Sequence, residues 1–500
     1  MQPSRLAVLI AIGGLLLPTL MTPTPAHASR ARVRTLRDIS GPSPLPADEC
    51  GLVTGQCSTT TSQFCKTDSD CALPSCSSCT PGETCISEHG SEYEPDIAVN
   101  PANRRNLIAV YSQDAQITTV VSTSRDRGRH WTQVLVPGLS QCTGGTAVGT
   151  ADPHVAIGPD GIAYTCSLTA ESTGTTPLLV NTSADGGLSW SNPVTVDDKP
   201  IVDGPFVTAD PHRPATAYLT WTRVPAVLPF SRTTDGGVTW TSPTIIPITP
   251  ESGESQFGTQ IHVLPDGTLV HISLQERIDL TRCGAGCVGG PTDVRLVRSA
   301  DQGDHWSDPP ILVTTVDPNT LKDPDSGTVI GHGISFPIPR VAVGADGTLY
   351  VVWHLIKSTT SSQIQFVKSV DGGLTWTAPA PVADETTQAF LPTVAVSPAG
   401  TIGVTYFDFR NDVLGDEELT TDLWFRHSHD GGATWSETHV AGPFDLRLAP
   451  SPGAFPLGDY FGLAPMGRTG FGALWVQTIS PQDQGATDTF FARLRVSPRP

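Results

Sequence analysis

Short apolar runs separated by turn residues recur along the chain from about residue 90 to the C-terminus. They come in pairs, and the second runs of the seven pairs are 107–112, 162–168, 217–222, 269–274, 349–355, 402–407 and 472–477. Short apolar runs between turn residues predict β-strands, whereas an amphipathic helix requires apolar residues three and four positions apart. No stretch has a convincing helical period, so the chain is predicted to be all-β.

A second pattern lies between these pairs. Six segments have the sequence Ser/Thr-x-Asp-x-Gly-x-x-Trp, and we call them the box turns: 124–131, 183–190, 233–240, 299–306, 369–376 and 428–435. The Asp carboxylate can accept hydrogen bonds from the backbone of its own turn, and the Gly can adopt a positive φ. The Trp offers a large apolar surface to neighbouring strands. Each box turn is therefore predicted to be a stapled β-hairpin turn.

The box turns recur at intervals of 50 to 70 residues, which is typical of repeat architectures. Their pattern resembles the Asp box, or BNR repeat, of sialidase-like β-propellers, and the resemblance covers about residues 90 to 497. Each unit then consists of strand A, a tight turn, strand B, a loop, strand C, the box turn and strand D. Such a unit is one four-stranded propeller blade.

The two repeats give different numbers of blades. There are six box turns but seven A–B pairs, and 489–496 adds one more strand after the seventh pair. Blade seven then lacks its outer strand, which the segment 32–39 is predicted to supply. Such closure would remove the open sheet edges. We favour seven blades, with six blades, as in sialidases proper, as the alternative.

The N-terminal region has the features of an exported protein. Arg5, an apolar run at 6–17 and Ala26-His27-Ala28 predict a cleaved signal peptide over residues 1–28. We therefore expect a secreted, extracellular or periplasmic protein, and no other stretch is predicted to span a membrane. The rest of the chain is divided into three parts. Residues 29–49 are an N-terminal segment with the possible ring-closing strand, residues 50–88 are a Cys-rich insert, and residues 89–497 are the propeller.

The chain contains 11 cysteines, which suits an oxidising compartment. Seven of them fall in the insert: Cys50, Cys57, Cys65, Cys71, Cys76, Cys79 and Cys85. This crowding predicts a small disulfide-stapled unit, with a metal-bound knot as the alternative. Because seven is odd, one thiol is free, pairs outside the insert or joins another chain. Outside the insert, we predict the disulfides Cys142–Cys166 and Cys283–Cys287.

Charge and motifs narrow the possible partners. The net charge of −19 argues against nucleic acid or an anionic membrane. No GxSxG, P-loop or HExxH motif is present, and no cofactor or metal is predicted. A calcium site stays open only at the oxygen-rich positions Asp317, Asn319, Asp323, Asp325 and Ser326. The expected partner is a glycan or glycoconjugate, and the protein is expected to be a monomer.

Candidate binding residues follow from their place in the repeat. The starts of the A strands and the ends of the B strands form one face of a propeller, and the box turns lie on the opposite side. On that face we predict a substrate-binding set: Arg223, Arg277, Arg340, Arg410, His154 and Asp408. A planar guanidinium matches a carboxylate bidentately, so an arginine cluster would bind an acidic sugar.

The resemblance to sialidases implies catalytic roles. In those enzymes a Tyr assisted by a Glu is the nucleophile, and an Asp is the acid/base. By placement, Tyr460 and Glu276 would be the nucleophile pair, and Asp96 or Asp152 the acid/base. The Phe-Arg-Ile-Pro signature of the family is absent from blade one, where the sequence is Glu94-Pro95-Asp96-Ile97-Ala98.

Two functions therefore remain open. One is a secreted sialidase-like glycoside hydrolase acting on glycans, including the exo-α-sialidase type. The other is a non-catalytic secreted β-propeller that binds glycan or protein. Convergence of three of the four arginines on one small anion would favour the enzyme, whereas guanidiniums tied to neighbouring carboxylates would favour the binding protein.

Overall fold

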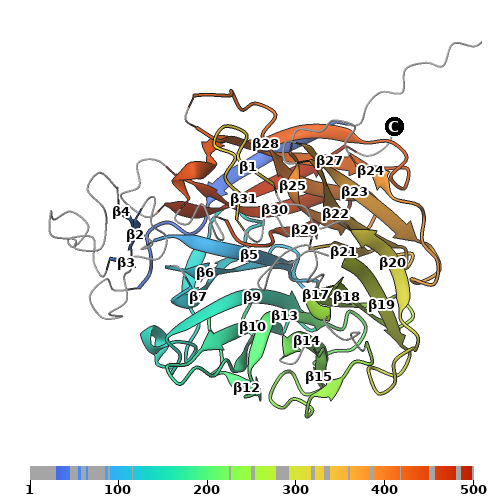
Figure 1. Ribbon diagram of the computed structural model, residues 1–500. Coiled ribbons are helices and arrows are strands. Elements are labelled where there is room, and N and C mark those ends of the chain that lie inside the picture. The colour runs from blue at the N-terminus through green and yellow to red at the C-terminus, as the bar shows by residue number, and fades with distance from the viewer. Residues whose placement is uncertain are drawn as a thin grey trace, which may run out of the picture.

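A computed structural model of the chain has an all-β architecture (Figure 1). The structure describes residues 30–45, 90–114, 116–223, 227–248, 254–277, 292–316, 321–331, 338–358, 361–382, 388–416, 418–449, 457–479 and 486–497, and the short strands β2 (Gly55–Cys57), β3 (Phe64–Cys65) and β4 (Cys85–Ser87). Within these ranges the helices are two three-residue 3-10 turns, and none is long and apolar enough to cross a membrane. The predicted all-β fold is confirmed.

Seven four-stranded antiparallel sheets form a ring, and each sheet is one blade. The innermost strands, among them β5, β9 and β13, surround the middle of the ring in Figure 1. Blade one consists of β5 (Glu92–Val99), β6 (Leu107–Gln113), β7 (Thr118–Ser124) and β8 (Thr132–Leu135), and blade two of β9 (Gly149–Ile157), β10 (Ala163–Ala170), β11 (Leu178–Ser183) and β12 (Val194–Asp197). Blade three consists of β13 (Ile201–Ala209), β14 (Ala217–Arg223), β15 (Pro229–Thr233) and β16 (Thr244–Ile245), and blade four of β17 (Glu254–Val263), β18 (Leu269–Arg277), β19 (Thr292–Ser299) and β20 (Ile311–Val316).

The last three blades follow the same order, except that the outer strand of blade seven comes from the N-terminus. Blade five consists of β21 (Arg340–Val343), β22 (Leu349–Ser358), β23 (Ser361–Ser369) and β24 (Ala380–Pro381). Blade six consists of β25 (Phe390–Val396), β26 (Ile402–Asp408), β27 (Thr420–Ser428) and β28 (Ser436–Asp445). Blade seven consists of β29 (Gly462–Met466), β30 (Gly470–Thr478), β31 (Thr487–Val496) and β1 (Ala31–Asp38).

The pairing of β1 with β31 closes the ring. The ladder is antiparallel and runs from Ala31 opposite Val496 to Asp38 opposite Phe490. The seventh blade thus joins the two ends of the propeller, as predicted for the segment 32–39. The favoured prediction of seven blades is confirmed. Opening the ring requires this ladder to break.

The box turns are stapled by their aspartates. In the fifth turn, Asp371 Oδ1 accepts hydrogen bonds from the N–H groups of Leu374 and Thr375 at 3.1 and 2.9 Å. Its Oδ2 accepts the Thr375 hydroxyl at 2.6 Å. These bonds from Thr375 lower the pKa of Asp371 to about 2. Gly373 has a φ of 92°, which explains the glycine of the motif.

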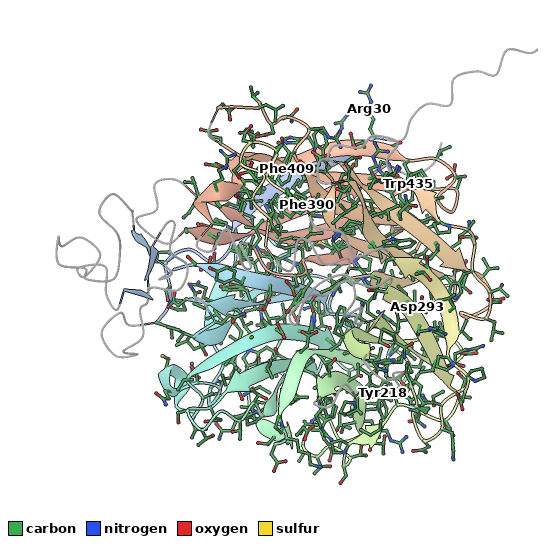
Figure 2. All side chains as sticks on the ribbon, viewed as in Figure 1. Arg30, Tyr218, Asp293, Phe390, Phe409 and Trp435 are labelled. Atoms are coloured by element: carbon green, nitrogen blue, oxygen red, sulfur yellow. The ribbon has the colours of Figure 1, made fainter. Side chains whose placement is uncertain are left out.

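The tryptophan of a box turn packs on the preceding blade. The Trp131 ring centroid lies 5.1 Å from that of Phe491 on blade seven. Trp306 lies 5.4 Å from Phe230 on blade three, and Trp435 lies 5.8 Å from Phe366 on blade five. Figure 2 labels Trp435 among the side chains that fill the space between sheets. The motif therefore stabilises the contact between successive blades.

The cysteines differ in part from the prediction. Cys166 on β10 is a free buried thiol, and burial raises its pKa. Cys142 is disulfide-bonded, so the predicted Cys142–Cys166 disulfide is wrong. The reason is that Cys166 points into the apolar core with Tyr164 and Trp221. The signal peptide, the Cys283–Cys287 pair and the disulfides of the insert lie outside the residues whose side chains the structure describes. The described strands of the insert, β2, β3 and β4, pair as one small sheet.

Candidate functional site

The starts of the innermost strands bring side chains together at the axis of the ring. The His154 ring centroid lies 4.9 Å from that of Phe206 and 4.4 Å from that of Tyr460. These three residues come from blades two, three and seven, so the site is assembled by ring closure. We call the following group the hub: Glu94, Asp96, Asp152, His154, Asp203, Phe206, Arg340, Asp459 and Tyr460.

A bulge at the start of the innermost strands aims the hub side chains. Gly204 and Gly258 have φ values of 43° and 61° at this bulge in blades three and four. In blades one and two the residues there are Glu94 and Asp152, with φ values of 54° and 51°. The left-handed conformation costs a non-glycine residue about 1 kcal/mol or more, and such strain concentrates at functional sites. Leu391 has a φ of 46° at the same bulge of blade six, so the strain belongs to the repeat, and in blades one and two the strained residues carry carboxyl groups.

Asp96 holds His154 in a fixed orientation. Asp96 Oδ2 lies 3.2 Å from His154 Nδ1 and also accepts the Val155 N–H at 3.1 Å. Burial acts to raise the pKa of Asp96, but the hydrogen bond and charge of His154 outweigh it, and this pKa is lowered. Because the Asp96 carboxylate binds Nδ1 of His154, the second ring nitrogen, Nε2, is left for another partner. His154 lines the central cavity, so this imidazole is available for binding or proton transfer.

Arg340 has an unpaired guanidinium. Its Cζ lies 5.3 Å from the ring centroid of Tyr460 and 6.0 Å from that of Phe206, which are cation–π distances. No carboxylate in the described part of the chain forms an ion pair with it. Burial lowers the pKa of this guanidinium, and the charge of Asp96 opposes the change. A buried guanidinium held by aromatic rings beside a cavity is an anion-binding group.

Tyr460 is engaged in the fold. Its hydroxyl donates a hydrogen bond of 3.0 Å to the Pro153 carbonyl. Burial, followed by the charges of Glu94 and Asp152, raises the pKa of Tyr460 well above 10. The phenol is therefore protonated and bonded to the backbone, which argues against the predicted nucleophile. The Tyr460 ring instead forms one side of the hub, against which His154 and Arg340 pack.

The hub surrounds a small cavity of about 30 Å³, lined by Asp152, His154, Asp203, Phe206, Arg340, Asp459 and Tyr460 among others. Such a volume holds about two water molecules. A sugar ring is larger, so a monosaccharide would reach the hub only if the side chains at its mouth moved apart.

The carboxyl groups at the cavity differ in protonation. Burial and then the charge of Asp152 raise the pKa of Asp203 to about 7. The same two causes raise the pKa of Glu94 and of Asp459 well above their usual range. Asp459 Oδ1 has no hydrogen-bond partner among the described residues. Burial and the charge of Asp152 thus favour the protonated form of three neighbouring carboxyl groups.

These pKa shifts predict a stability maximum at mildly acidic pH. Groups with raised folded-state pKa values, including Asp203 at about 7 and Asp488 at about 8, destabilise the fold as pH rises from 4 to 8. For one carboxyl the loss is on the order of 4 kcal/mol. Box-turn aspartates such as Asp371, with a folded pKa of about 2, stabilise above pH 4 and lose this contribution as pH falls to 2.

Calorimetric melting between pH 2.5 and 9 tests this prediction. The Tm should be highest near pH 4 to 5, and the fall above it should be shallower in Asp203→Asn. A Tm that rises steadily from pH 4 to pH 8 would contradict the assigned protonation states.

The predicted arginine cluster does not form. Arg223 donates from Nε to Asp197 Oδ2 at 2.9 Å, and its guanidinium is ion-paired with that carboxylate. Arg410 is ion-paired with Asp408 at 2.6 Å and with Glu437 at 2.7 Å. Asp197 lies on β12 and Glu437 on β28, at the outer edges of blades two and six, and Asp408 is the last residue of β26. Of the described arginines predicted for this site, only Arg340 reaches the hub.

The remaining predicted residues divide into three groups. Asp96, Asp152, His154 and Tyr460 meet in the hub with Arg340. Asp408 accepts hydrogen bonds from Arg410 Nε at 2.6 Å and Trp424 Nε1 at 2.9 Å, so its carboxylate is not available to a substrate. The side chains of Glu276 and Arg277, at the end of β18, lie outside the described residues.

Other carboxylate groups are held by arginine. Arg447 binds Asp323 at 2.9 Å and Asp325 at 3.1 Å, which are two of the positions left open for calcium. In the described part of the chain, no group of three or more His, Cys, Asp or Glu side chains has the arrangement of a metal site.

Comparison with known proteins leaves the family open. No protein-family model matches the chain, and no curated protein matches it in sequence. Two similar solved structures are a protein of unknown function from Dyadobacter fermentans, with 14% identity, 70% of this chain and 95% of that chain covered and a TM-score of 0.43, and a Hadza microbial sialidase, with 17% identity, 80% and 65% covered and a TM-score of 0.43. A third is a Penicillium chrysogenum α-L-arabinanase complexed with arabinobiose, with 13% identity, 80% and 92% covered and a TM-score of 0.42. With TM-scores below 0.5, these likenesses assign neither an activity nor a ligand to this chain.

The sequence places Asp203 and Asp459 at the starts of innermost strands, on the predicted ligand face, but sequence reasoning assigned them no role and missed Phe206. Asp203 and Phe206 flank Gly204-Pro205 in the same way that Tyr93 and Asp96 flank Glu94-Pro95. The recurrent x-x-Pro-x at the starts of the innermost strands was the signal that could have found Asp203 and Phe206, because it marks the same bulge in blades one, two and three.

Proposed function

We propose that the hub is the active centre of a glycoside hydrolase that acts on an acidic glycan. The observation that carries this proposal is the difference between two carboxyl groups at the cavity. Asp203 has a pKa of about 7 because it is buried beside the charge of Asp152. Glycosidases use one carboxylic acid and one carboxylate on either side of the scissile bond, and a carboxyl group with a raised pKa is the candidate for the acid.

In the proposed reaction, Asp203 is the general acid. Its proton passes to the oxygen of the leaving group as the glycosidic bond breaks. Asp152 is the carboxylate that attacks the anomeric carbon or removes a proton from the attacking water. Positive charge develops on the sugar in this step, and the negative charge of Asp152 stabilises it. Arg340 binds the acidic group of the sugar.

The exo-α-sialidase type is a finer version of this proposal and is less well supported. A sialidase-type reaction uses a tyrosine nucleophile, whereas the Tyr460 hydroxyl is bonded to the Pro153 carbonyl. Sialidase-like recognition also needs an arginine cluster, and among the predicted arginines whose side chains the structure describes, Arg340 is the one at the hub. A carboxylate nucleophile acting on a sugar with one acidic group fits the hub better.

Non-catalytic binding of a glycan or protein is the second candidate. It is favoured by the cavity of about 30 Å³, which is too small for a sugar ring, and by the ion pairs that hold Arg223 and Arg410. In this case the hub would contact only the tip of a ligand.

Replacing Arg340 should separate acidic from neutral substrates. In Arg340→Ala, we expect kcat/KM for a fluorogenic uronide or sialoside to fall by about 10²-fold, because one charge-assisted bidentate contact contributes about 3 kcal/mol. Turnover of a neutral glycoside should change by less than about threefold. The measurement is initial rates over a panel of 4-methylumbelliferyl glycosides.

The matched control is Arg104→Ala, which removes an exposed arginine from the turn between β5 and β6. It should leave all rates unchanged. No turnover of any glycoside by the wild-type protein would reject the enzyme. Binding of an acidic sugar that is lost in Arg340→Ala would then favour the second candidate.

A further inference from the structure

Blade seven has no box turn, and arginines gather where one would be. Two of them, Arg493 and Arg495, lie near the end of β31, and Arg32 and Arg37 lie on β1. Arg32 is directly opposite Arg495 in the ladder, and Arg37 is opposite Phe491. Directly opposite residues of antiparallel strands share a face, and like charges in that relation are destabilising. The sequence therefore maintains a repulsive pair at the seam of the ring.

The first box turn adds two more arginines to the same place. Phe491 packs under this turn, because a Cβ added to Gly128 would lie 2.1 Å from the Phe491 ring. Arg493 and Arg495 alternate with Phe491 along β31 and so share its face. Arg37 Nε donates to the Arg129 carbonyl at 3.4 Å. Burial and then the charges of Arg127, Arg129 and Arg495 lower the pKa of Arg493.

Arg127 takes a position that favours glycine. Its φ is 69°, and the equivalent residue is glycine in four other box turns: Gly186, Gly236, Gly372 and Gly431. An arginine in the left-handed region is strained, as is Gln302 at the same position of the fourth box turn, with a φ of 61°. The first box turn alone has arginines on both sides of its glycine, at Arg127 and Arg129.

We propose that Arg32, Arg37, Arg127, Arg129, Arg493 and Arg495 form a binding site for an acidic polysaccharide chain, and we call this group the arginine seam. None of the six has an ion pair within the ranges that the structure describes. The carboxylate of the same turn, Asp126, is occupied by the N–H groups of Arg129 and His130 at 2.9 and 3.0 Å.

Charge favours a polysaccharide over other polyanions. The protein carries a net charge of −19, so its remaining surface repels a flat anionic membrane or a long stiff duplex. A single flexible chain can follow the seam while staying clear of that surface. Guanidinium groups match carboxylate and sulfate oxygens bidentately. Arg30, the residue before β1, projects outward at the edge of the molecule (Figure 2).

The seam is independent of the hub. The box turns and the end of β31 lie on the side of the ring opposite the starts of the innermost strands, so binding at the seam does not require turnover at the hub.

Binding of defined polymers by the mature protein tests the proposal. Polygalacturonate and heparin supply carboxylate and sulfate groups respectively, dextran is the neutral control, and a DNA duplex and phosphatidylserine vesicles represent the other polyanions. At low salt, we expect at least one acidic polysaccharide to bind, and its affinity to fall by about tenfold or more between 50 and 300 mM salt. Tighter binding of the duplex or the vesicles than of both polysaccharides, or equal binding of dextran, would overturn it.

Variants locate the site. Arg493→Gln/Arg495→Gln should weaken binding by about tenfold or more, and Arg127→Gly by about fivefold. Because glycine suits a φ of 69°, Arg127→Gly should keep or raise the Tm, so lost binding cannot be ascribed to misfolding. The control Lys199→Gln/Lys357→Gln removes the same charge from exposed positions outside blades one and seven and should change affinity by less than about twofold. A control as weak as the double arginine variant would overturn the assignment.

Discussion

Deleting residues 30–41 should abolish the closed ring and remove most of the folding stability. The deletion takes away β1, the partner of β31 in blade seven. It also removes the Ile39 carbonyl, which accepts the Ser122 hydroxyl of blade one at 2.8 Å, and the Ser40 hydroxyl, which bonds to Glu92 at 3.1 Å. The seam loses its ladder and its cross-blade bonds together, so we expect a loss of about 5 kcal/mol or more, comparable with the whole stability of a typical domain. The measurement is cooperative thermal unfolding followed by circular dichroism.

A peptide of residues 30–41 provides the control, because a missing strand can be supplied in trans. The peptide should restore cooperative melting, and a scrambled peptide of the same composition should not. A truncated protein that stays monomeric and melts within a few degrees of the full chain would show that the ring does not depend on β1.

Replacing Asp203 by Asn should reduce kcat/KM for a methylumbelliferyl glycoside by about 10²- to 10⁴-fold, the range for loss of a general acid. Asparagine has nearly the same shape as aspartate and keeps one carbonyl oxygen, but it cannot supply the proton. A 2,4-dinitrophenyl glycoside needs no protonation of its leaving group, so its rate should fall by less than about tenfold.

Comparing the rates on the two substrates separates a loss of proton donation by Asp203 from a structural change in the hub. The exposed Asp198→Asn is the matched control and should be neutral with both. An equal loss on both substrates in Asp203→Asn would mean that Asp203 shapes the hub without donating a proton.

The sequence was sufficient to predict the strands and the ring, because each blade repeats the same alternation and the same turn chemistry. The run at 402–407, for example, lies within β26 (Ile402–Asp408). The closing strand followed from counting, because seven strand pairs left blade seven one strand short. These features depend on local pattern and on the need to cover a sheet edge.

The side-chain partners at the site could not be predicted in the same way. Arg223 pairs with Asp197, 26 residues away on the preceding blade, and Arg410 pairs with Glu437, 27 residues away across its own blade. Asp408, two residues before Arg410 and ion-paired with it, is a local signal, but nothing local distinguishes Arg223 from Arg340, which contacts Phe206 and Tyr460. The difference depends on which strands face one another after the ring closes. The left-handed φ of Glu94 and Asp152 is likewise fixed by the bulge and not by residue type.

The central claim is that the hub works with Asp203 as a proton donor, and the pH dependence of kcat/KM tests it most directly. This parameter reports the pKa of groups in the free protein. The account predicts that kcat/KM falls tenfold per pH unit above a pKa near 7, the value for Asp203, and that the fall is absent for the 2,4-dinitrophenyl substrate. A kcat/KM that stays constant between pH 6 and pH 8.5 for the methylumbelliferyl substrate would contradict it.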